Sequence, residues 1–403
     1  MILAQLGEPA LIERIAAVVG PPTNQRLILA IGDDAAAWRQ PRATLVASTD
    51  MLVEHVHFEL GLTGWRDLGW KALAVNLSDL AAMGASPLVA LVSAGLRADI
   101  RVEDVHELYI GMGELAAATG CTIAGGDTVQ VRTDVVLNVA VIGELPAPEA
   151  GGRSGRGVGR QGADLLRRSG ARPGDEVAVT GTLGAAAAGL FMLQRGDALP
   201  EPVSNALARA HRRPQPQLAA GRALRAVGVR SAIDISDGLL ADLEKLCRAS
   251  GVGATVRADL LPIDPAVRAA YPDRALAWAA AGGEDYQLLF TAPARTMARA
   301  LERLRADGVE ATVIGQAHDD AGRVRLVDAQ GGEVPLRERG WDHFRAGRPT
   351  PEIAPEASGA PGGPELPGAS GRAGMPGAAG AAGMAPEGPV AGPADDCNAG
   401  SAR

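Results

Sequence analysis

Short runs of β-branched and other apolar residues alternate with longer segments of helical periodicity through most of this chain. The predicted strands are residues 44–49, 133–143, 176–180, a run that ends at 233–235, and 286–291. The predicted helices are residues 70–83, residues 185–194 and a segment that follows Gly238. Because strands and helices alternate, the sequence predicts a mixed α/β (α+β) fold.

Two segments contain too few large apolar residues to build a core. Residues 151–162 hold six glycines and three arginines, and residues 351–403 hold 12 Gly, 9 Pro and 14 Ala with no aromatic residue. Such compositions bury too little apolar surface to offset the entropy lost on ordering. We therefore predict two domains with two unfolded segments. The parts are an N-terminal domain (1–146), a flexible Gly/Arg-rich loop (147–162), a C-terminal α/β domain (163–345) and a disordered tail (346–403).

The composition argues against several classes of protein. A formal net charge of −8 does not suit a nucleic-acid binder, which would carry a basic face. No run of about 18 apolar residues is present, so no membrane-spanning helix is expected, and residues 1–10 lack the features of a secretion signal. Cys121, Cys247 and Cys397 are too far apart for a disulfide framework or a zinc motif. A cytoplasmic location is the expectation.

Aspartates recur beside Gly, Ser or Thr where predicted apolar segments end or turn. They are Asp33, Asp34, Asp50, Asp79, Asp127, Asp234 and Asp237. Asp50 is expected just past a strand, and Asp79 shares one face of the predicted helix 70–83 with Asn76 because the two are three residues apart. Binding residues concentrate at such junctions, since loops there are held by a rigid scaffold.

Carboxylates that converge in this way suit a hard cation such as Mg²⁺, which prefers oxygen ligands. Without cations the carboxylates could not all stay ionised, and a polyphosphate could not approach them. A single aspartate beside glycine more often makes a cap or a turn. The repeated pattern in one chain therefore favours a metal-bridged phosphate site.

Other motifs carry little functional information. Residues 157–162 match Gly-x-Gly-x-x-Gly, but a Gly/Arg-rich run precedes them where a dinucleotide site needs a strand. The sequence contains no Gly-x-x-x-x-Gly-Lys-Ser/Thr P-loop. His55 and His57 could face one side of a strand end, as polar surface, as ligand contacts or as half of a zinc site, although no third zinc ligand accompanies them.

Several short stretches resemble, in order along the chain, the motifs of thiamine-monophosphate kinases, a family of the aminoimidazole-ribonucleotide-synthetase-like superfamily. The stretches are 31–35 (IGDDA), 48–50 (STD), 57–58 (HF), 71–84 (KALAVNLSDLAAMG), 125–128 (GGDT), 168–175 (RSGARPGD), 180–181 (TG), 234–239 (DISDGL), 282–286 (GGEDY) and 340–344 (GWDHF). The insert at 151–162 and the tail from 351 depart from the family pattern.

The resemblance implies a two-domain fold, ATP as co-substrate, several Mg²⁺ ions, and phosphorylation of thiamine monophosphate to thiamine diphosphate. It also implies an N-terminal domain that binds ATP and Mg²⁺ and joins the subunits of a homodimer. The implied metal ligands are Asp34, Ser48, Thr49, Asp50, Asp79, Asp127, Asp234 and Asp237. The implied ATP contacts are Tyr109, Gly126, Asp127, Arg168 and Ser236. The implied substrate contacts are His57, Glu284 and Trp341.

No general acid or base is expected, because the acceptor phosphate is mostly ionised at neutral pH. Three of the implied contacts have plainer alternatives. Trp341 could anchor the end of the chain in the core, Glu284 could be a turn residue, and Arg168 could be a solvated charge beside Arg167.

Two other classes of function are open at this point. One is a different superfamily enzyme, although selenophosphate synthetases usually carry a reactive cysteine near the N-terminus and no cysteine precedes Cys121. A synthetase of the aminoimidazole-ribonucleotide type would lack the trio of His57, Glu284 and Trp341. The other class is a non-catalytic nucleotide- or metal-binding regulator, against which the complete set of carboxylates counts.

Overall fold

The computed structural model describes residues 27–29, 33–40, 43–146 and 165–344. The predicted loop 147–162 and the predicted tail 346–403 lie outside these residues. All described residues belong to one compact unit, and the residue boundaries given above for the two domains stay a prediction. Within the described part of the chain, no helix is long and apolar enough to cross a membrane.

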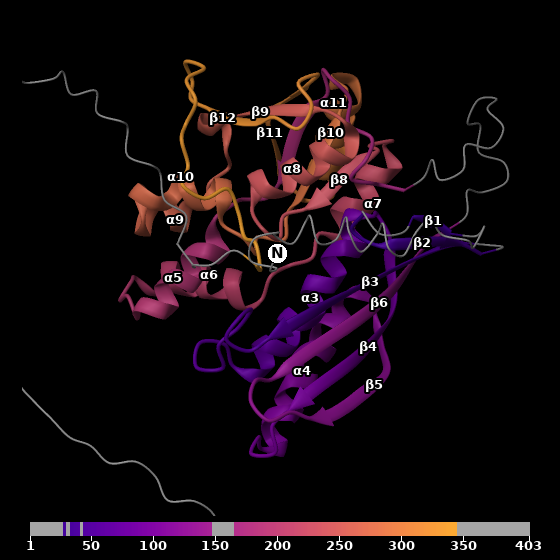
Figure 1. Cartoon of the computed structure of the whole chain (residues 1–403), viewed down its shortest axis with the longest axis vertical. Coiled ribbons are helices and arrows are strands. Elements are labelled where there is room, and N and C mark those ends of the chain that lie inside the picture. The colour runs from indigo at the N-terminus through magenta and orange to yellow at the C-terminus, as the bar shows by residue number, and fades with distance from the viewer. Residues whose placement is uncertain (1–26, 30–32, 41–42, 147–164, 345–403) are drawn as a thin grey trace, which may run out of the picture. The chain divides into compact units, whose positions relative to one another are not determined.

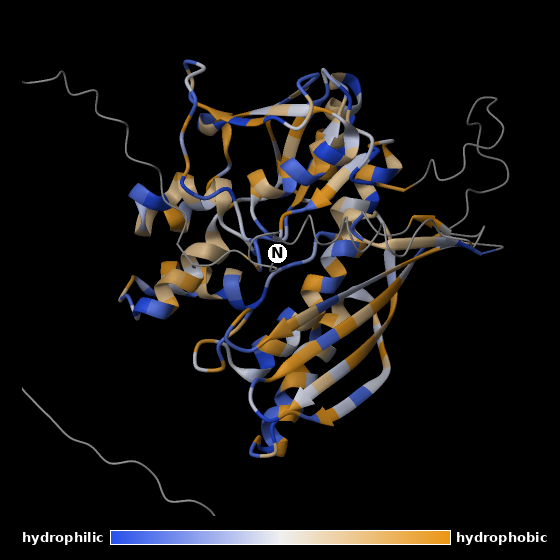
Figure 2. Ribbon diagram, in the orientation of Figure 1, coloured by the Kyte–Doolittle hydropathy of each residue, from blue (hydrophilic) through white to orange (hydrophobic). Residues whose placement is uncertain are grey.

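The first half of the described chain forms a six-stranded sheet in the order β1-β2-β3-β6-β4-β5 (Figure 1). Its strands are β1 (Leu27–Leu29), β2 (Ala36–Arg39), β3 (Ala43–Val53), β4 (Ser86–Leu96), β5 (Thr122–Gln130) and β6 (Val136–Pro146). All neighbours are antiparallel except β4 and β5, which are parallel. Apolar residues dominate β3, β4 and β6 (Figure 2), so both faces of the sheet carry hydrophobic side chains.

Two helices, α3 (Trp65–Ala82) and α4 (Val102–Thr119), cover one face of this sheet. Alternate strand residues such as Val46 and Leu52 are buried in a core shared with these helices, whereas Met51 on the opposite face is 53% exposed. The alternation follows from the two-residue period of a strand. The first sheet therefore has one packed face and one open face.

The helices α3 and α4 approach so closely that glycine is required at their crossing. A Cβ added to Gly69 would lie 1.8 Å from the carbonyl oxygen of Leu108, and a Cβ added to Gly111 would lie 1.7 Å from the carbonyl oxygen of Arg66. Backbones can touch in this way only where both side chains are absent. The contact holds α3 against α4 and so fixes the helix that carries Asp79.

The second half forms another six-stranded sheet, in the order β12-β9-β11-β7-β10-β8, with β12 and β9 parallel and the other pairs antiparallel. Its strands are β7 (Glu176–Thr180), β8 (Ser231–Asp234), β9 (Gly253–Arg257), β10 (Leu288–Ala292), β11 (Ala311–His318) and β12 (Val324–Val327). The helices of this half are α5 (Ala185–Arg195), α6 (Glu201–Arg212), α7 (Leu218–Ala226), α8 (Leu239–Ser250), α9 (Pro265–Ala270), α10 (Pro272–Ala281) and α11 (Ala294–Ala306), with a 3₁₀ turn at Ala258–Leu260.

Helix α3 connects the two halves, because it packs against the first sheet on one side and against α7 and β8 on the other. Its Ala- and Leu-rich sequence is buried on nearly all sides, and even Lys71, Asn76 and Ser78 are fully buried. Because this helix is buried on all sides, its polar side chains cannot reach water, and burying them without partners would cost free energy. These polar side chains therefore require partners inside the protein.

The predicted elements mostly coincide with those observed. The predicted strand 176–180 is β7, and the predicted helix 185–194 is α5 with one residue added. The prediction that Asp50 lies just past a strand is wrong, because β3 continues to Val53 and keeps Asp50 within the ladder. Strand β5 was not predicted, since its Gly-Gly-Asp centre has low strand propensity; pairing with β4 compensates for it.

Candidate functional site

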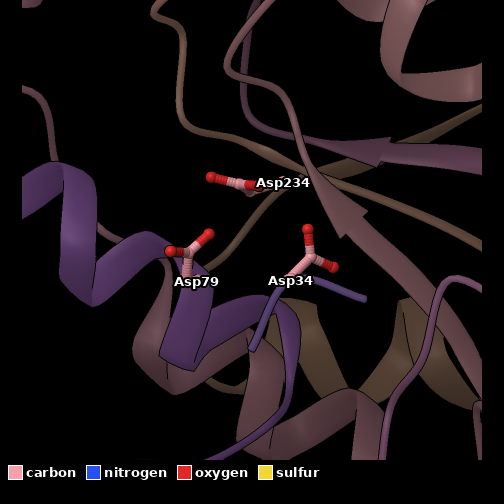
Figure 3. Close-up of side chains that lie close together, drawn as sticks. All are labelled: Asp34, Asp79 and Asp234. Atoms are coloured by element: carbon pink, nitrogen blue, oxygen red, sulfur yellow. The ribbon is translucent and has the colours of Figure 1, made fainter. Parts of the chain in front are cut away.

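Three carboxylates from distant parts of the sequence meet between the two sheets. Asp34 lies just before β2, Asp79 lies near the end of α3, and Asp234 ends β8. Each offers an oxygen within 4.8 Å of the others, and Figure 3 shows the side chains directed toward a common space. The donor set consists only of oxygen atoms, which suits Mg²⁺ better than zinc or another soft metal.

Burial and mutual repulsion disfavour the ionised forms of these side chains. Burial, followed by the charges of Asp50, Asp234 and Asp34, raises the pKa of Asp79 well above its usual value. Burial and then Asp34 raise the pKa of Asp234 to about 8, and burial and then Asp237 raise that of Asp50 to about 6. A cluster that holds protons near neutral pH is one that bound cations would ionise. The residues present therefore fit the metal.

Neighbouring polar groups orient the carboxylates. The Ser48 hydroxyl donates to Oδ2 of Asp79, and the Ser78 hydroxyl donates to Oδ2 of Asp234 at 2.6 Å. The backbone N–H of Asp50 donates to Oδ1 of Asn76 at 2.8 Å. The buried polar residues of α3 thus fix β3 and β8 relative to the helix.

Arg168 is fixed at the edge of the cluster rather than solvated. Its Nε and Nη2 both donate to Oδ1 of Asp34, at 2.9 and 2.6 Å, and its side chain is 25% exposed. Its backbone N–H donates to Asp33 at 3.2 Å. The alternative of a free surface charge beside Arg167 is therefore wrong.

The turn that carries Ser236 and Asp237 is held by Asp242 and Lys245, neither of which the sequence patterns indicated as a site residue. Oδ2 of Asp242 accepts the backbone N–H groups of Ser236, Asp237 and Gly238 at 3.0, 2.9 and 3.1 Å. The ammonium of Lys245 lies 2.5 Å from Asp237 and 2.8 Å from Asp242. Asp242 could have been recognised from its position in the first turn of the helix after Gly238. A carboxylate there usually accepts hydrogen bonds from the free N–H groups of the helix start.

Thr49 and Asp127 do not join the three carboxylates within one chain. Register places Asp50 on the packed face of the first sheet, whereas Thr49 and Asp127 lie on the open face. The Thr49 hydroxyl there donates to Oδ1 of Asn138 at 3.2 Å. Gly126 lies beside Asp127 on edge strand β5, and Tyr109 lies on α4, packed against the core.

Glu284 stands at a strained turn and has two buried partners. Its φ is +69°, in the left-handed region, so it is a turn residue in backbone terms. Its Oε1 lies 2.6 Å from Nζ of Lys71, and its Oε2 lies 3.2 Å from Nδ1 of His211. Despite burial, these neighbours lower the pKa of Glu284 to about 2. In the sequence, Lys71 is distinguished only by its place in the family motif 71–84, and no pattern marks His211 as a site residue.

His57 has one defined tautomer. The backbone N–H of Val53 donates to Nδ1 at 3.1 Å, which leaves Nε2 as the protonated nitrogen of the neutral ring. Burial and the neighbouring His343, whose ring centroid lies 5.0 Å away, lower the pKa of His57 to about 4. At neutral pH this side chain is therefore an uncharged hydrogen-bond donor. His55 instead contacts Glu59 at the surface, so the two histidines do not form a pair.

Trp341 lies on the segment that follows β12, and it is attached to the site through its backbone. Its N–H donates to the carbonyl of Asp237 at 2.9 Å, and its indole nitrogen lies 3.2 Å from Nδ1 of His343. The side chain is 38% exposed. The core-anchor alternative is wrong, because a residue that is 38% exposed is not buried in the core.

Comparison with known proteins identifies the family. The sequence matches the model of the AIR synthase related protein N-terminal domain over residues 32–145 and that of the C-terminal domain over residues 172–327. The thiamine-monophosphate kinase of Escherichia coli strain K12 is 39% identical over 324 residues, which cover 78% of this chain and 92% of that protein. The chain belongs to the thiamine-monophosphate kinase family.

Other members of the thiamine-monophosphate kinase family agree with this assignment. The enzyme of Bacillus subtilis strain 168 is 32% identical over 320 residues, which cover 78% of this chain and 93% of that protein. The structure of AaThiL complexed with AMPPCP and TMP is 32% identical, with a TM-score of 0.71 over 85% of this chain and 99% of that one. The two-domain α/β fold expected from the family motifs is thereby confirmed.

Proposed function

We propose that this chain transfers the γ-phosphate of ATP to thiamine monophosphate, giving thiamine diphosphate and ADP. The observation that carries the proposal is the convergence of Asp34, Asp79 and Asp234 in a chain of this family. The matching solved structure holds AMPPCP, an ATP analogue, together with TMP. A coupled assay of ADP release with thiamine monophosphate, checked by chromatography of the product, tests it; ADP release without thiamine diphosphate would refute it.

We propose Mg²⁺ ions as the cofactor of this reaction, held by the carboxylates of both halves. Bound Mg²⁺ would neutralise phosphate charge and bridge the nucleotide to the protein. The proposed ligands are Asp34, Ser48, Asp50, Asp79, Asp234 and Asp237 around the cluster, together with Thr49 and Asp127 on the open face of the first sheet. The raised pKa values of Asp79, Asp234 and Asp50 support a cation here, since a cation would relieve the repulsion between them.

The residues proposed to contact ATP are Tyr109, Gly126, Asp127, Arg168 and Ser236. Arg168 is already oriented by two hydrogen bonds to Asp34, so its guanidinium loses little freedom on meeting a phosphate. The backbone of Ser236 is fixed by Asp242 in the same way. Orientation of this kind lowers the barrier because the reacting groups need not be ordered during the reaction.

We further propose a cytoplasmic homodimer joined through the open face of the first sheet. Met51, Leu91 and Val129 lie on that face and are 53%, 44% and 54% exposed. Large apolar side chains exposed on one face of a sheet are typical of an interface. Light scattering during size-exclusion chromatography would give twice the monomer mass if this is right.

His57→Asn should weaken thiamine monophosphate binding and keep most of kcat. The pKa of His57 is lowered to about 4, so its protonation state does not change near neutral pH and cannot set a limb of the profile there. The acceptor phosphate titrates near pH 6, so the acidic limb of the pH–rate profile should stay near pH 6 in the variant. A thousandfold loss of kcat, together with loss of that limb, would make His57 a general base.

Trp341→Ala should raise KM for thiamine monophosphate by about tenfold or more and leave KM for ATP nearly unchanged. The exposed part of the ring is proposed to stack on the cationic substrate, a contact worth about 1–3 kcal/mol in comparable sites. Trp341→Phe is the control and should keep most of the affinity. Equal increases in both KM values would contradict the stacking role.

A further inference from the structure

Lys71 is a fully buried ammonium that the proposed phosphate transfer does not use. Its side chain is 0% exposed, and its Nζ forms an ion pair with Oε1 of Glu284 at 2.6 Å. Leaving a charge in an apolar helix is costly unless a partner compensates it. The pair thus joins α3, the helix of Asp79, to the Gly-Gly-Glu-Asp-Tyr segment.

His211 completes the enclosure of the same carboxylate. Its Nδ1 lies 3.2 Å from Oε2 of Glu284, and its side chain is 2% exposed. Glu284 itself is 26% exposed. Lys71 and His211 therefore lie on the buried side of the carboxylate, and the accessible edge belongs to Glu284 alone.

The backbone beneath Glu284 is fixed as firmly as its side chain. Its N–H donates to the carbonyl of Ser236 at 2.8 Å, and a Cβ on Gly283 would lie 2.7 Å from that oxygen. The φ of +69° at Glu284 is unfavourable for a residue with a side chain. Strain of this kind persists where the surroundings determine one conformation, and it concentrates at functional sites.

The charge arrangement decides what the exposed edge can bind. The ion pair of Lys71 and Glu284 has no net charge. Its carboxylate is the exposed member, so the negative end of the pair faces the accessible side. His57, which interacts electrostatically with both Glu284 and Lys71, presents the Nε2–H donor. An acceptor and a donor that share one site match the two neighbouring groups of an aminopyrimidine edge, an exocyclic amino group and a ring nitrogen that accepts.

We infer that Lys71 and His211 are positioning residues that hold Glu284 as an ionised acceptor for the amino group of the substrate's aminopyrimidine ring, a role that rests on the proposed function. His57 donates to the adjacent ring nitrogen. The trio thereby sets specificity for the amino form of the pyrimidine, separately from phosphate transfer at the aspartate cluster.

The test compares thiamine monophosphate with oxythiamine monophosphate, in which oxygen replaces the 4-amino group and the donor–acceptor order of the edge is reversed. The wild-type enzyme should prefer the amino substrate in kcat/KM by about a hundredfold or more. Lys71→Met should raise KM for thiamine monophosphate by about 10- to 100-fold, leave KM for ATP within about threefold, and cut the preference at least tenfold. Without the ammonium, Glu284 loses the partner at 2.6 Å that fixes it as an ionised acceptor, so the site should discriminate less against the oxo form.

Controls separate this role from a structural one. Lys71→Arg should keep most of the wild-type preference for the amino substrate. His211→Asn should reduce that preference, but by less than Lys71→Met does. The preference is a ratio measured on one preparation, so it does not depend on the folded fraction. An unchanged ratio in Lys71→Met would overturn the inference while the proposed function stands, and no thiamine diphosphate from the wild type would overturn both. A different result would assign another role to Glu284. If the wild-type enzyme turned over the oxo form normally but lost kcat/KM with an analogue whose thiazolium is replaced by a neutral ring, Glu284 would contact the thiazolium cation instead of the amino group.

Discussion

Replacing Asp79 with asparagine is expected to lower kcat by about a thousandfold while the protein stays folded. Asp79 contributes an oxygen to the cluster with Asp34 and Asp234, and the change removes its charge without altering its size. Its partner Ser48 can still donate to the amide oxygen. Steady-state kinetics at saturating Mg²⁺ and ATP measure the loss, and near-normal turnover would remove Asp79 from the proposed ligands.

The same substitution should stabilise the metal-free protein at neutral pH. The pKa of Asp79 is raised well above 3.8 in the folded state, so its carboxyl favours unfolding at any pH above its unfolded value. Melting curves should therefore show a higher Tm for Asp79→Asn at pH 7, with the difference vanishing as the pH falls below about 4. Asp320→Asn, at a site 59% exposed, is the control and should change neither kcat nor Tm.

Gly111→Ala is expected to lower the free energy of unfolding by about 3 kcal/mol, the upper end of the usual cost of overpacking. The added Cβ would lie 1.7 Å from the carbonyl oxygen of Arg66, an atom of helix backbone that cannot rotate away. Helices α3 and α4 would have to separate, and α3 carries Asp79 and Lys71. Activity should therefore fall together with stability in denaturant titrations and kinetic assays.

Gly113→Ala provides a matched control on the same helix. A Cβ at Gly113 would have no atom within 4 Å. Because alanine favours helix over glycine, this variant should gain up to about 1 kcal/mol. Equal effects of the two substitutions would show that helix propensity, and not the crossing of α3 and α4, determines the outcome.

The sequence predicted elements well where a single pattern dominated. Residues 176–180 are uniformly strand-like, and the Ala-rich run from 185 is uniformly helical, so both were placed almost to the residue. Strand β5 was missed because Gly125, Gly126 and Asp127 disfavour a strand locally. Only pairing with β4 makes that segment extended, and pairing depends on residues far away in the sequence.

The sequence alone determined which residue types are present: acidic residues at recurrent motifs, a family resemblance, and the absence of a P-loop. Tertiary structure decided which of them meet. It joined Asp34, Asp79 and Asp234, placed Thr49 and Asp127 on the opposite face of the sheet, and gave Glu284 its buried partners. Which face a strand residue occupies depends on register, and whether a carboxylate is ionised depends on neighbours that only folding supplies.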